Sequence, residues 1–323
     1  MRVRQFQYGT EIATVLLVRS AESRARREGN EYLKLTLGDR TGTVPAVVLD
    51  GVDEARPSCR AGQAVHVEGT YSVDPRFGPR VLVAGIRAAG AHEYTREDLI
   101  DGPTRSAEHM ESDLHELVAT VQHPHLRRLL TTLFGPGTAL WAQFRDAPAA
   151  KHYHQAYRHG LLEHTLTVAQ AVSAISATFP GIDRDVAVTG ALLHDIGKLD
   201  AYELCDETIA MSDQGRLYGE IALGYFRVRT AIEGLEGFPA DTAHAVLHII
   251  LSHHGSLEHG SPVIPCTREA TLVHMIDNLG GRLGSFDRIE KALPAGDQWS
   301  AYDKGIGGGA FFAFPAQDER RAA

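Results

Sequence analysis

The chain of 323 residues changes its hydrophobic pattern about a third of the way along its length. Before residue 95, short runs rich in Val, Leu and Thr alternate with turn residues, which is typical of β-strands. After residue 113, apolar residues recur at the spacing of amphipathic helices. The composition, with 43% hydrophobic and 23% charged residues, is that of an ordinary globular protein. These patterns predict a multidomain protein in which an all-β domain precedes an all-α domain.

The first predicted domain contains five strand-like segments. They are residues 12–20, 32–39, 43–50, 64–73 and 80–88. No apolar pattern of helix length lies among them, and a longer polar loop joins the first two. Five short strands of this kind favour a small barrel, and the OB-fold is the commonest five-stranded candidate. We therefore predict an OB-fold barrel over residues 1–94.

A polar segment separates the two predicted domains. Residues 95–113, TREDLIDGPTRSAEHMESD, contain few apolar residues, so we predict a linker there. Helical patterns extend over residues 114–295. The tail, residues 296–323, includes DKGIGGG, which lacks the strand-then-helix context of a phosphate-binding glycine loop. We interpret this tail as a flexible connector.

Charge is distributed unevenly along the chain. The formal net charge is −9, from 32 Lys and Arg against 41 Asp and Glu. Residues 1–95 hold 13 basic and 11 acidic residues, a balance of +2, so the rest holds 19 and 30, a balance of −11. The whole-chain charge argues against a general nucleic-acid coat protein, because such proteins neutralise phosphates with excess positive charge. Only the first domain could attract phosphate groups electrostatically.

The cysteines and the apolar runs bear on the location of the protein. Cys59, Cys205 and Cys266 are odd in number and far apart, so they indicate neither a disulfide framework nor a CxxC metal site. This usage suits a reducing compartment. The first residues lack the apolar core of a signal peptide, and no apolar run approaches the length of a membrane span. We expect a cytoplasmic protein with no membrane contact.

Four places in the helical half put metal-binding residue types inside apolar patterns. They are His164 in GLLEHTLTVA, His194–Asp195 in ALLHDIGK, His253–His254 in IILSHHGS and Asp277 in LVHMIDNLGG. Burying a histidine and a carboxylate costs free energy unless each finds a partner. Imidazole and carboxylate together suit Mn, Fe, Zn or Mg. A single histidine in an apolar helix is more often a core residue, whereas this ordered set is a much more specific indication of a metal site.

The ordered set resembles the HD superfamily of metal-dependent phosphohydrolases, which are all-helical. Longer stretches resemble one group within it, the YhaM-type 3′-to-5′ exoribonucleases, which also have an N-terminal OB domain. These stretches are AKHYHQAYRHGLLEHT, HDIGK, LSHHGSLEHGSPVIPCTREA and HMIDNLGGRL. The resemblance covers nearly the whole chain and implies two-metal hydrolysis of single-stranded nucleic acid.

The resemblance also implies roles for individual residues. It implies one ion bound by His164, His194, Asp195 and Asp277, and a second bound by Asp195, His253 and His254. Asp195 would bridge the two ions, which would be Mn or else Mg, Fe or Co. Lys198, one helical turn after Asp195, would contact the substrate phosphate as a second catalytic residue, although it could instead be a solvated lysine at a helix end. Glu220 stands where relatives commonly have a histidine ligand, and it is either an oxygen ligand or an ordinary exposed glutamate.

Single-strand binding by an OB barrel uses aromatic rings that stack on bases and cations that follow the phosphate backbone. The candidate rings in the first domain are Phe6, Tyr8, Tyr32, Tyr71 and Phe77, some of which would belong to the core instead. The candidate cations are Arg24, Arg26, Arg27, Arg76 and Arg80. Strand alternation places Tyr32 on the face opposite Leu33, as expected of an exposed binding surface. In the stretch before His164, His154 and Arg158 are candidates for phosphate contact, with a capped surface loop as the alternative.

Three functions agree with these features. The first is a 3′-to-5′ exonuclease acting on single-stranded RNA, or single-stranded DNA, and releasing nucleoside 5′-monophosphates. The second is an HD phosphohydrolase of free nucleotides or cyclic dinucleotides. The third is a single-strand-binding protein without catalysis. We predict the first, and the sequence leaves a homo-oligomer open.

Overall fold

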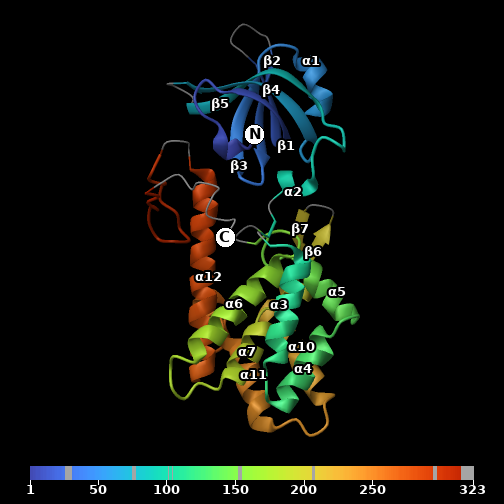
Figure 1. The fold of residues 1–323 in the computed structure, drawn as a ribbon, viewed down its shortest axis with the longest axis vertical. Coiled ribbons are helices and arrows are strands. Elements are labelled where there is room, and N and C mark those ends of the chain that lie inside the picture. The colour runs from blue at the N-terminus through green and yellow to red at the C-terminus, as the bar shows by residue number, and fades with distance from the viewer. Residues whose placement is uncertain are drawn as a thin grey trace. The chain divides into compact units, whose positions relative to one another are not determined.

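The computed structural model describes residues 1–25, 31–74, 78–100, 102–103, 105–151, 155–205, 208–293 and 297–313. The chain divides into two compact units. One comprises residues 1–101 with 286–323, and the other comprises residues 102–285. Figure 1 shows the strands of the first unit and the helices of the second.

The first unit is a closed five-stranded barrel. Its strands are β1 (Glu11–Ala25), β2 (Glu31–Asp39), β3 (Gly42–Val48), β4 (Ala64–Asp74) and β5 (Gly78–Ala88). Their order around the barrel is β1-β2-β3-β5-β4, and β1 pairs with β4 to close it. β3 and β5 are parallel, and the other neighbouring strands are antiparallel. The predicted OB-fold class is confirmed.

Strand alternation builds the barrel core. Leu33, Leu35 and Leu37 on β2 are buried, and Leu35 stands opposite the buried Ala46 on β3. Since side chains alternate between the two faces of a strand, the residues between these leucines point away from the core. Short helices complete the part of this unit before residue 100. They are η1 (Val3–Gln5), α1 (Val52–Ala55), η2 (Arg56–Ser58) and α2 (Arg96–Leu99).

The C-terminal residues of the first unit are held by specific contacts. Isolated bridges join Trp299 to Phe311 and Asp303 to Gly308. The Asp303 carboxylate also accepts a hydrogen bond from the Arg288 guanidinium at 2.8 Å. Over residues 297–313 the structure thus differs from the flexible connector that we expected, because the glycine-rich turn folds back and pairs with itself.

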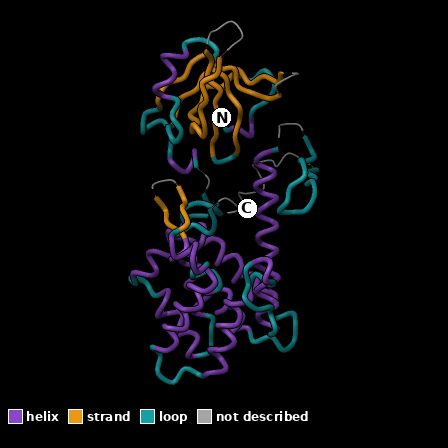
Figure 2. Tube along the Cα trace, turned by 180° about the vertical axis from the view of Figure 1, so that it is seen from behind, coloured by secondary structure: helices purple, strands orange, loops and turns teal. Residues whose placement is uncertain are grey.

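The second unit is predominantly helical (Figure 2). Its helices are α3 (Ala107–Ala119), α4 (Pro124–Phe134), α5 (Ala139–Asp146), α6 (Gly160–Ser176), α7 (Arg184–Leu193), α8 (Lys198–Ala201), α9 (Asp213–Tyr218), α10 (Glu220–Glu233), α11 (Ala240–Ser252), η3 (Leu257–His259) and α12 (Arg268–Ala292). A two-stranded hairpin, β6 (Tyr202–Cys205) and β7 (Thr208–Met211), lies between α8 and α9. The predicted all-α class is confirmed, with this hairpin as an addition that we did not predict.

The unit boundaries differ from the predicted domain boundaries of 95–113 for the linker and 114–295 for the helical domain. α2 and the first half of α3 lie within residues 95–113. α3 begins there because the Ser106 hydroxyl accepts a hydrogen bond from the His109 amide at 3.3 Å and caps the helix. Met110 on this half is buried in the core of the second unit. The second boundary, at residue 285, falls within α12.

The core of the second unit centres on α6, α7 and α11. α7 is buried from Val186 to Leu193, and its Gly190 permits a close approach of α11. A Cβ added at Gly190 would lie 2.3 Å from the Cδ1 atom of Ile249 on α11. This packing brings the C-terminal ends of α7 and α11 together. Among the described helices, none is both long enough and apolar enough to cross a membrane.

Candidate metal centre

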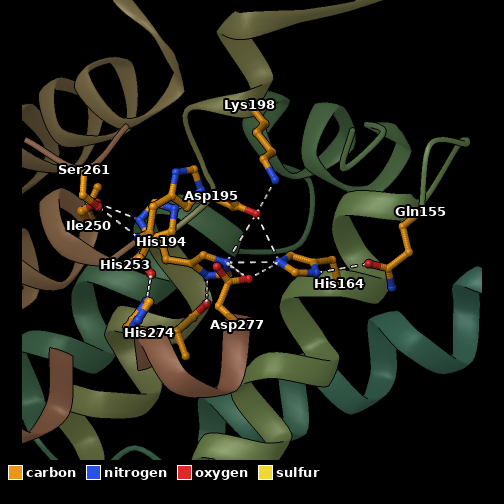
Figure 3. Close-up of polar contacts among 12 residues, drawn as sticks. Gln155, His164, His194, Asp195, Lys198, Ile250, His253, Ser261, His274 and Asp277 are labelled. Atoms are coloured by element: carbon orange, nitrogen blue, oxygen red, sulfur yellow. Dashed lines mark hydrogen bonds and ion pairs between the residues drawn. The ribbon is translucent and has the colours of Figure 1, made fainter. Parts of the chain in front are cut away.

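The four motifs of the helical half converge on one place (Figure 3). His164 projects from α6, and Asp277 projects from α12. The pair His194–Asp195 directly follows α7, and His253–His254 directly follows α11. His194, Asp195 and His253 are almost completely buried, at 1%, 2% and 0% exposure. Two of these four helices, α7 and α11, are the ones that Gly190 lets pack closely.

The turn after Asp195 needs a glycine. A Cβ added at Gly197 would lie 1.9 Å from the Glu220 carbonyl oxygen and 2.4 Å from the Gly224 amide nitrogen. Real Cβ atoms do not approach backbone atoms so closely, so the first turn of α10 can pack here only against glycine. The Gly197 position thereby fixes where the preceding Asp195 and the following Lys198 stand.

Two groups of ligand-type atoms lie side by side. The atoms of His164, His194 and Asp277 lie within 4.8 Å of one another, and so do those of Asp195, His253 and His254. In the first group, His164 Nε2 lies 3.0 Å from Asp277 Oδ1 and 3.2 Å from His194 Nε2. All six residues are ones that the sequence motifs named.

Asp195 stands between the two groups. Its Oδ2 atom lies 3.2 Å from His164 Nε2 and 3.3 Å from His194 Nε2. Its Oδ1 atom lies 3.6 Å from His253 Nε2. One carboxylate thus turns one oxygen toward each group, as a ligand shared by two cations would.

The histidines are oriented by hydrogen bonds at Nδ1. Three of them contact backbone carbonyl oxygens at 2.7–2.9 Å: His194 with Ala191, His253 with Ile250, and His254 with His259. A carbonyl oxygen only accepts, so Nδ1 carries the proton in each ring, and a neutral ring keeps its lone pair on Nε2. Metal-ligating histidines are commonly oriented in this way. In each of these rings Nε2 is therefore the available ligand atom.

Two buried atoms in the centre lack hydrogen-bond partners. Within the described ranges, neither Asp195 Oδ1 nor His253 Nε2 has one, since their separation of 3.6 Å is too long for a hydrogen bond. Buried polar groups without partners are costly and uncommon. A divalent cation between these two atoms would satisfy both. The residues present therefore fit a metal ion.

Comparison with known proteins agrees with this geometry. Residues 161–281 match the family model of the HD domain. These residues form an HD domain. The chain is also 26% identical over 295 residues to the 3′-5′ exoribonuclease YhaM of Shouchella clausii (strain KSM-K16), and the match covers 90% of each protein. The resemblance to YhaM-type proteins that the motifs predicted is confirmed.

Among the solved structures that are similar to part of the chain is an OB-fold domain. It is the second OB-fold domain of replication protein A from Methanococcus maripaludis, which is 16% identical and has a TM-score of 0.23. That match covers 27% of this chain and 92% of the other.

Electrostatics at the centre of the HD domain favour bound cations. Burial lowers the pKa of His194, but the neighbouring Asp195 and Asp277 raise it by more, to about 10. Burial raises the pKa of Asp195, but Lys198 and His194 lower it by more, to well below its usual range. The carboxylates are thus ionised, and without metal the surrounding cations balance them.

Lys198 and Glu220 lie close to the HD-domain centre. Lys198 Nζ donates to Asp195 Oδ2 at 2.6 Å. Burial lowers the pKa of Lys198, whereas Asp195, Asp277 and Glu220 raise it, with a net rise. Glu220 is the first residue of α10 and is half-buried. It is not in either group of ligand atoms among the described residues, so its ligand role stays a prediction.

The residues predicted to contact nucleic acid differ in their exposure and in their present partners. On the barrel, Tyr8 is 77% exposed and Tyr32 is half-buried. Phe6 and Tyr71 are buried in the barrel core, so these two rings are not available to stack on bases. Arg80 pairs with Asp74 at 2.7 Å, and in the second unit Arg158 pairs with Asp146 at 2.5 Å. Arg24 pairs with Glu22 at 2.7 Å. The remaining candidates lie outside the described residues: Arg26, Arg27, Arg76, Phe77 and His154.

Several side chains that support the centre were not singled out by the sequence. His274 Nδ1 lies 2.7 Å from the His253 carbonyl oxygen, and Ser261 Oγ accepts from the His254 amide at 3.0 Å. Gln155 Oε1 lies 3.1 Å from His164 Nδ1. All three are in the stretches that carry the YhaM resemblance, but spacing along the chain gave no signal of these contacts.

Proposed function

We propose that the protein is a metal-dependent 3′-to-5′ exonuclease that acts on single-stranded RNA and releases nucleoside 5′-monophosphates with two metal ions. The observation that carries this proposal is Asp195, whose two oxygens face two separate groups of ligand atoms. A carboxylate shared between two cations is a common device of enzymes that hydrolyse phosphodiesters.

The two groups assign ligands to each ion. His164, His194 and Asp277, with Asp195 Oδ2, would hold the first ion, and His253 and His254, with Asp195 Oδ1, would hold the second. When bound, two divalent ions about 3.5–4 Å apart activate a water molecule and stabilise the leaving oxygen of a phosphodiester. The mixture of imidazole and carboxylate donors suits Mn, with Mg, Fe or Co as the alternatives. Glu220 would add an oxygen ligand and favour the harder ions.

Lys198 would contribute positive charge toward the substrate. Its ammonium group is held at 2.6 Å from Asp195 Oδ2, and its raised pKa keeps it charged at neutral pH. A phosphate oxygen that gains negative charge during cleavage would be stabilised by this cation. Lys198 therefore joins Asp195 as a proposed catalytic residue.

Single-stranded RNA is the proposed substrate for two reasons. The relative from Shouchella clausii is named a 3′-5′ exoribonuclease, and the match spans both units. The OB-fold barrel exposes Tyr8 and carries the small positive balance of the chain. Stacking of bases on such rings, together with cations along the backbone, binds single strands with little sequence preference.

The proposal is tested with 5′-labelled homopolymer RNA and added Mn²⁺. We expect the labelled strand to shorten progressively while nucleoside 5′-monophosphates accumulate, and chelation to stop both. Removing an outer partner of a metal ligand typically lowers activity by up to about 100-fold. Asp195→Asn changes a ligand itself, so it should lower the activity by more than this, while single-strand binding persists. Turnover of free nucleotides without RNA cleavage would instead identify a nucleotide phosphohydrolase. Binding without either reaction would identify a single-strand-binding protein.

A further inference from the structure

His164 differs from the other three histidines in the partner of its Nδ1 atom. Where those rings contact backbone carbonyls, His164 Nδ1 contacts the side-chain amide of Gln155 at 3.1 Å. Figure 3 shows His164 between Gln155 and the carboxylates of Asp195 and Asp277. An amide can present either its oxygen or its NH₂ group. By itself, this contact would leave the tautomer of His164 undetermined.

Glu163 resolves which way the amide of Gln155 faces. Gln155 Nε2 lies 3.3 Å from Glu163 Oε2, and the Tyr157 hydroxyl donates to the same oxygen. A carboxylate only accepts hydrogen bonds, so the NH₂ group of Gln155 must face Glu163. Its oxygen must then face His164, which places the proton of the ring on Nδ1. Each donor in this chain of contacts has one permitted direction.

The backbone at Gln155 adopts a conformation that favours glycine over glutamine. Gln155 has φ +57°, in the left-handed region that non-glycine residues rarely adopt. Its carbonyl oxygen accepts from the Ala149 amide at 3.1 Å, and a Cβ added at Gly160 would lie 2.0 Å from that oxygen. The segment is therefore folded tightly back onto the start of α6. Glycine would fit the backbone of Gln155 better, yet glycine would have no amide to offer His164.

From these contacts we infer that Gln155 is a positioning residue of the first metal site. It fixes His164 in the tautomer that presents Nε2 to the ion, and Glu163 sets the direction of the amide. The inference rests on the proposed metal centre. For His194, His253 and His254, backbone carbonyls orient the ring, whereas for His164 a side chain does so. Of these four histidines, only the orientation of His164 can therefore be changed by substituting the partner of its Nδ1 atom.

The test measures Mn²⁺ binding to the full-length protein by calorimetry and by electron paramagnetic resonance of free Mn²⁺. Gln155→Met keeps the size of the side chain and removes the amide. Gln155→Gly also removes it and suits the left-handed backbone, so this variant should fold at least as well as the natural protein. Loss of an outer partner of a ligating histidine typically weakens metal binding by about 10–100-fold. In both variants we expect the affinity for one of the two ions to fall by this factor, and the affinity for the other ion to stay unchanged.

Two further variants sharpen the test. Glu163→Gln lets the amide of Gln155 face either way, so we expect a smaller loss of affinity for the same ion. Gln170→Met is the matched control, because Gln170 lies on α6 with His164 but contacts Asp113 instead, at 3.5 Å. This control should bind both ions as the natural protein does.

The outcomes separate the inference from the proposed function. If the natural protein binds no divalent metal at these residues, the proposed metal centre itself is wrong. If the natural protein binds two ions and Gln155→Gly binds both with unchanged affinity, the metal centre stands and the role of Gln155 is wrong. Equal weakening in Gln170→Met would also overturn that role, because the effect would then be a general one on α6.

Discussion

At the scale of single residues, the adjacency of His194 and Asp195 has a physical explanation. α7 ends at Leu193, and the turn that follows buries both side chains of the pair in one centre, with His194 Nε2 at 3.3 Å from Asp195 Oδ2. His194 belongs to the first group of ligand atoms, whereas Asp195 has one oxygen near each group. Burial of an unpaired carboxylate would be costly, so this position is stable only with cations nearby. In the metal-free protein, protonated His194 and Lys198 are those cations.

Metal binding should therefore release protons. The pKa of His194 is raised to about 10 in the folded protein, from about 6.5 when unfolded. Protonated His194 thus stabilises the metal-free fold fully below pH 6.5, and this stability is lost as the pH rises through 10. A ligating ring must give up its proton from Nε2, so affinity for Mn²⁺ should fall as the pH is lowered from 9 to 6. Calorimetry at pH 7.5 in buffers with different heats of ionisation measures the proton release, and equal heats in all buffers would contradict it.

At the scale of elements, close helix approaches hold the centre together. α7 approaches α11 at Gly190, and the turn after Asp195 approaches α10 at Gly197. The glycine of HDIGK is thus needed for packing, and this packing constrains the turn that carries Asp195 and Lys198. Neither approach could be read from the sequence, because a glycine in an apolar pattern does not reveal its neighbour.

Gly197→Ala should destabilise the fold and weaken catalysis together. The added methyl group would overlap the Glu220 carbonyl oxygen, and overpacking of this kind costs about 1–3 kcal/mol in the free energy of unfolding. The matched control is Gly280→Ala within α12, where an added Cβ meets no atom within 4 Å. That change should stabilise the protein by about 0.5–1 kcal/mol. Urea denaturation compares the two, and equal effects would show that Gly197 is not at a close approach.

Substitutions of Glu220, the first residue of α10, test whether its carboxylate is a metal ligand. Burial lowers the pKa of both Lys198 and His254, and the Glu220 carboxylate is one of the neighbouring charges that raise each of them. The net result is a raised pKa for Lys198 and a lowered pKa for His254. Glu220→Ala should raise the Mn²⁺ concentration needed for half-maximal activity and leave the unfolding temperature nearly unchanged. Glu220→His should increase affinity for Zn²⁺, Ni²⁺ or Co²⁺, which imidazole prefers. An unchanged Mn²⁺ requirement in Glu220→Ala would make Glu220 a surface residue.

Local patterns could predict most elements, because strand alternation and helical spacing are properties of short segments. The structure also brings together the six ligand-type residues that the motifs named, since each lies in a recognisable stretch. What the sequence could not predict depends on burial, strand pairing and backbone conformation, which local hydrophobic patterns do not specify. The start of α3 depends on burial of Met110, the β6–β7 hairpin on pairing of short strands, and the contact of Gln155 on a left-handed backbone.

At the scale of the whole molecule, we propose that the two units have separable tasks. The barrel unit exposes the ring of Tyr8, whereas the buried histidines and carboxylates lie in the helical unit. Binding of a long strand should then depend on residues that the cleavage of a small phosphodiester does not need.

Replacing both Tyr8 and Tyr32 with alanine should separate these tasks. Base–aromatic stacking contributes about 1–3 kcal/mol per base, so KM for long single-stranded RNA should rise at least several-fold. Hydrolysis of a chromogenic phosphodiester should keep its natural rate. Phe179→Ala is a suitable control, because Phe179 is an exposed ring of the helical unit, at 57% exposure. An unchanged KM in the double variant would exclude these rings from strand binding.

The central claim is that Asp195 joins two adjacent cation positions. Anomalous diffraction from crystals soaked in Mn²⁺ tests it most directly. The account predicts two anomalous peaks about 3.5–4 Å apart, one beside His164, His194 and Asp277 and the other beside His253 and His254, with one oxygen of Asp195 at each. A single peak, or a second peak away from His253 and His254, would contradict it.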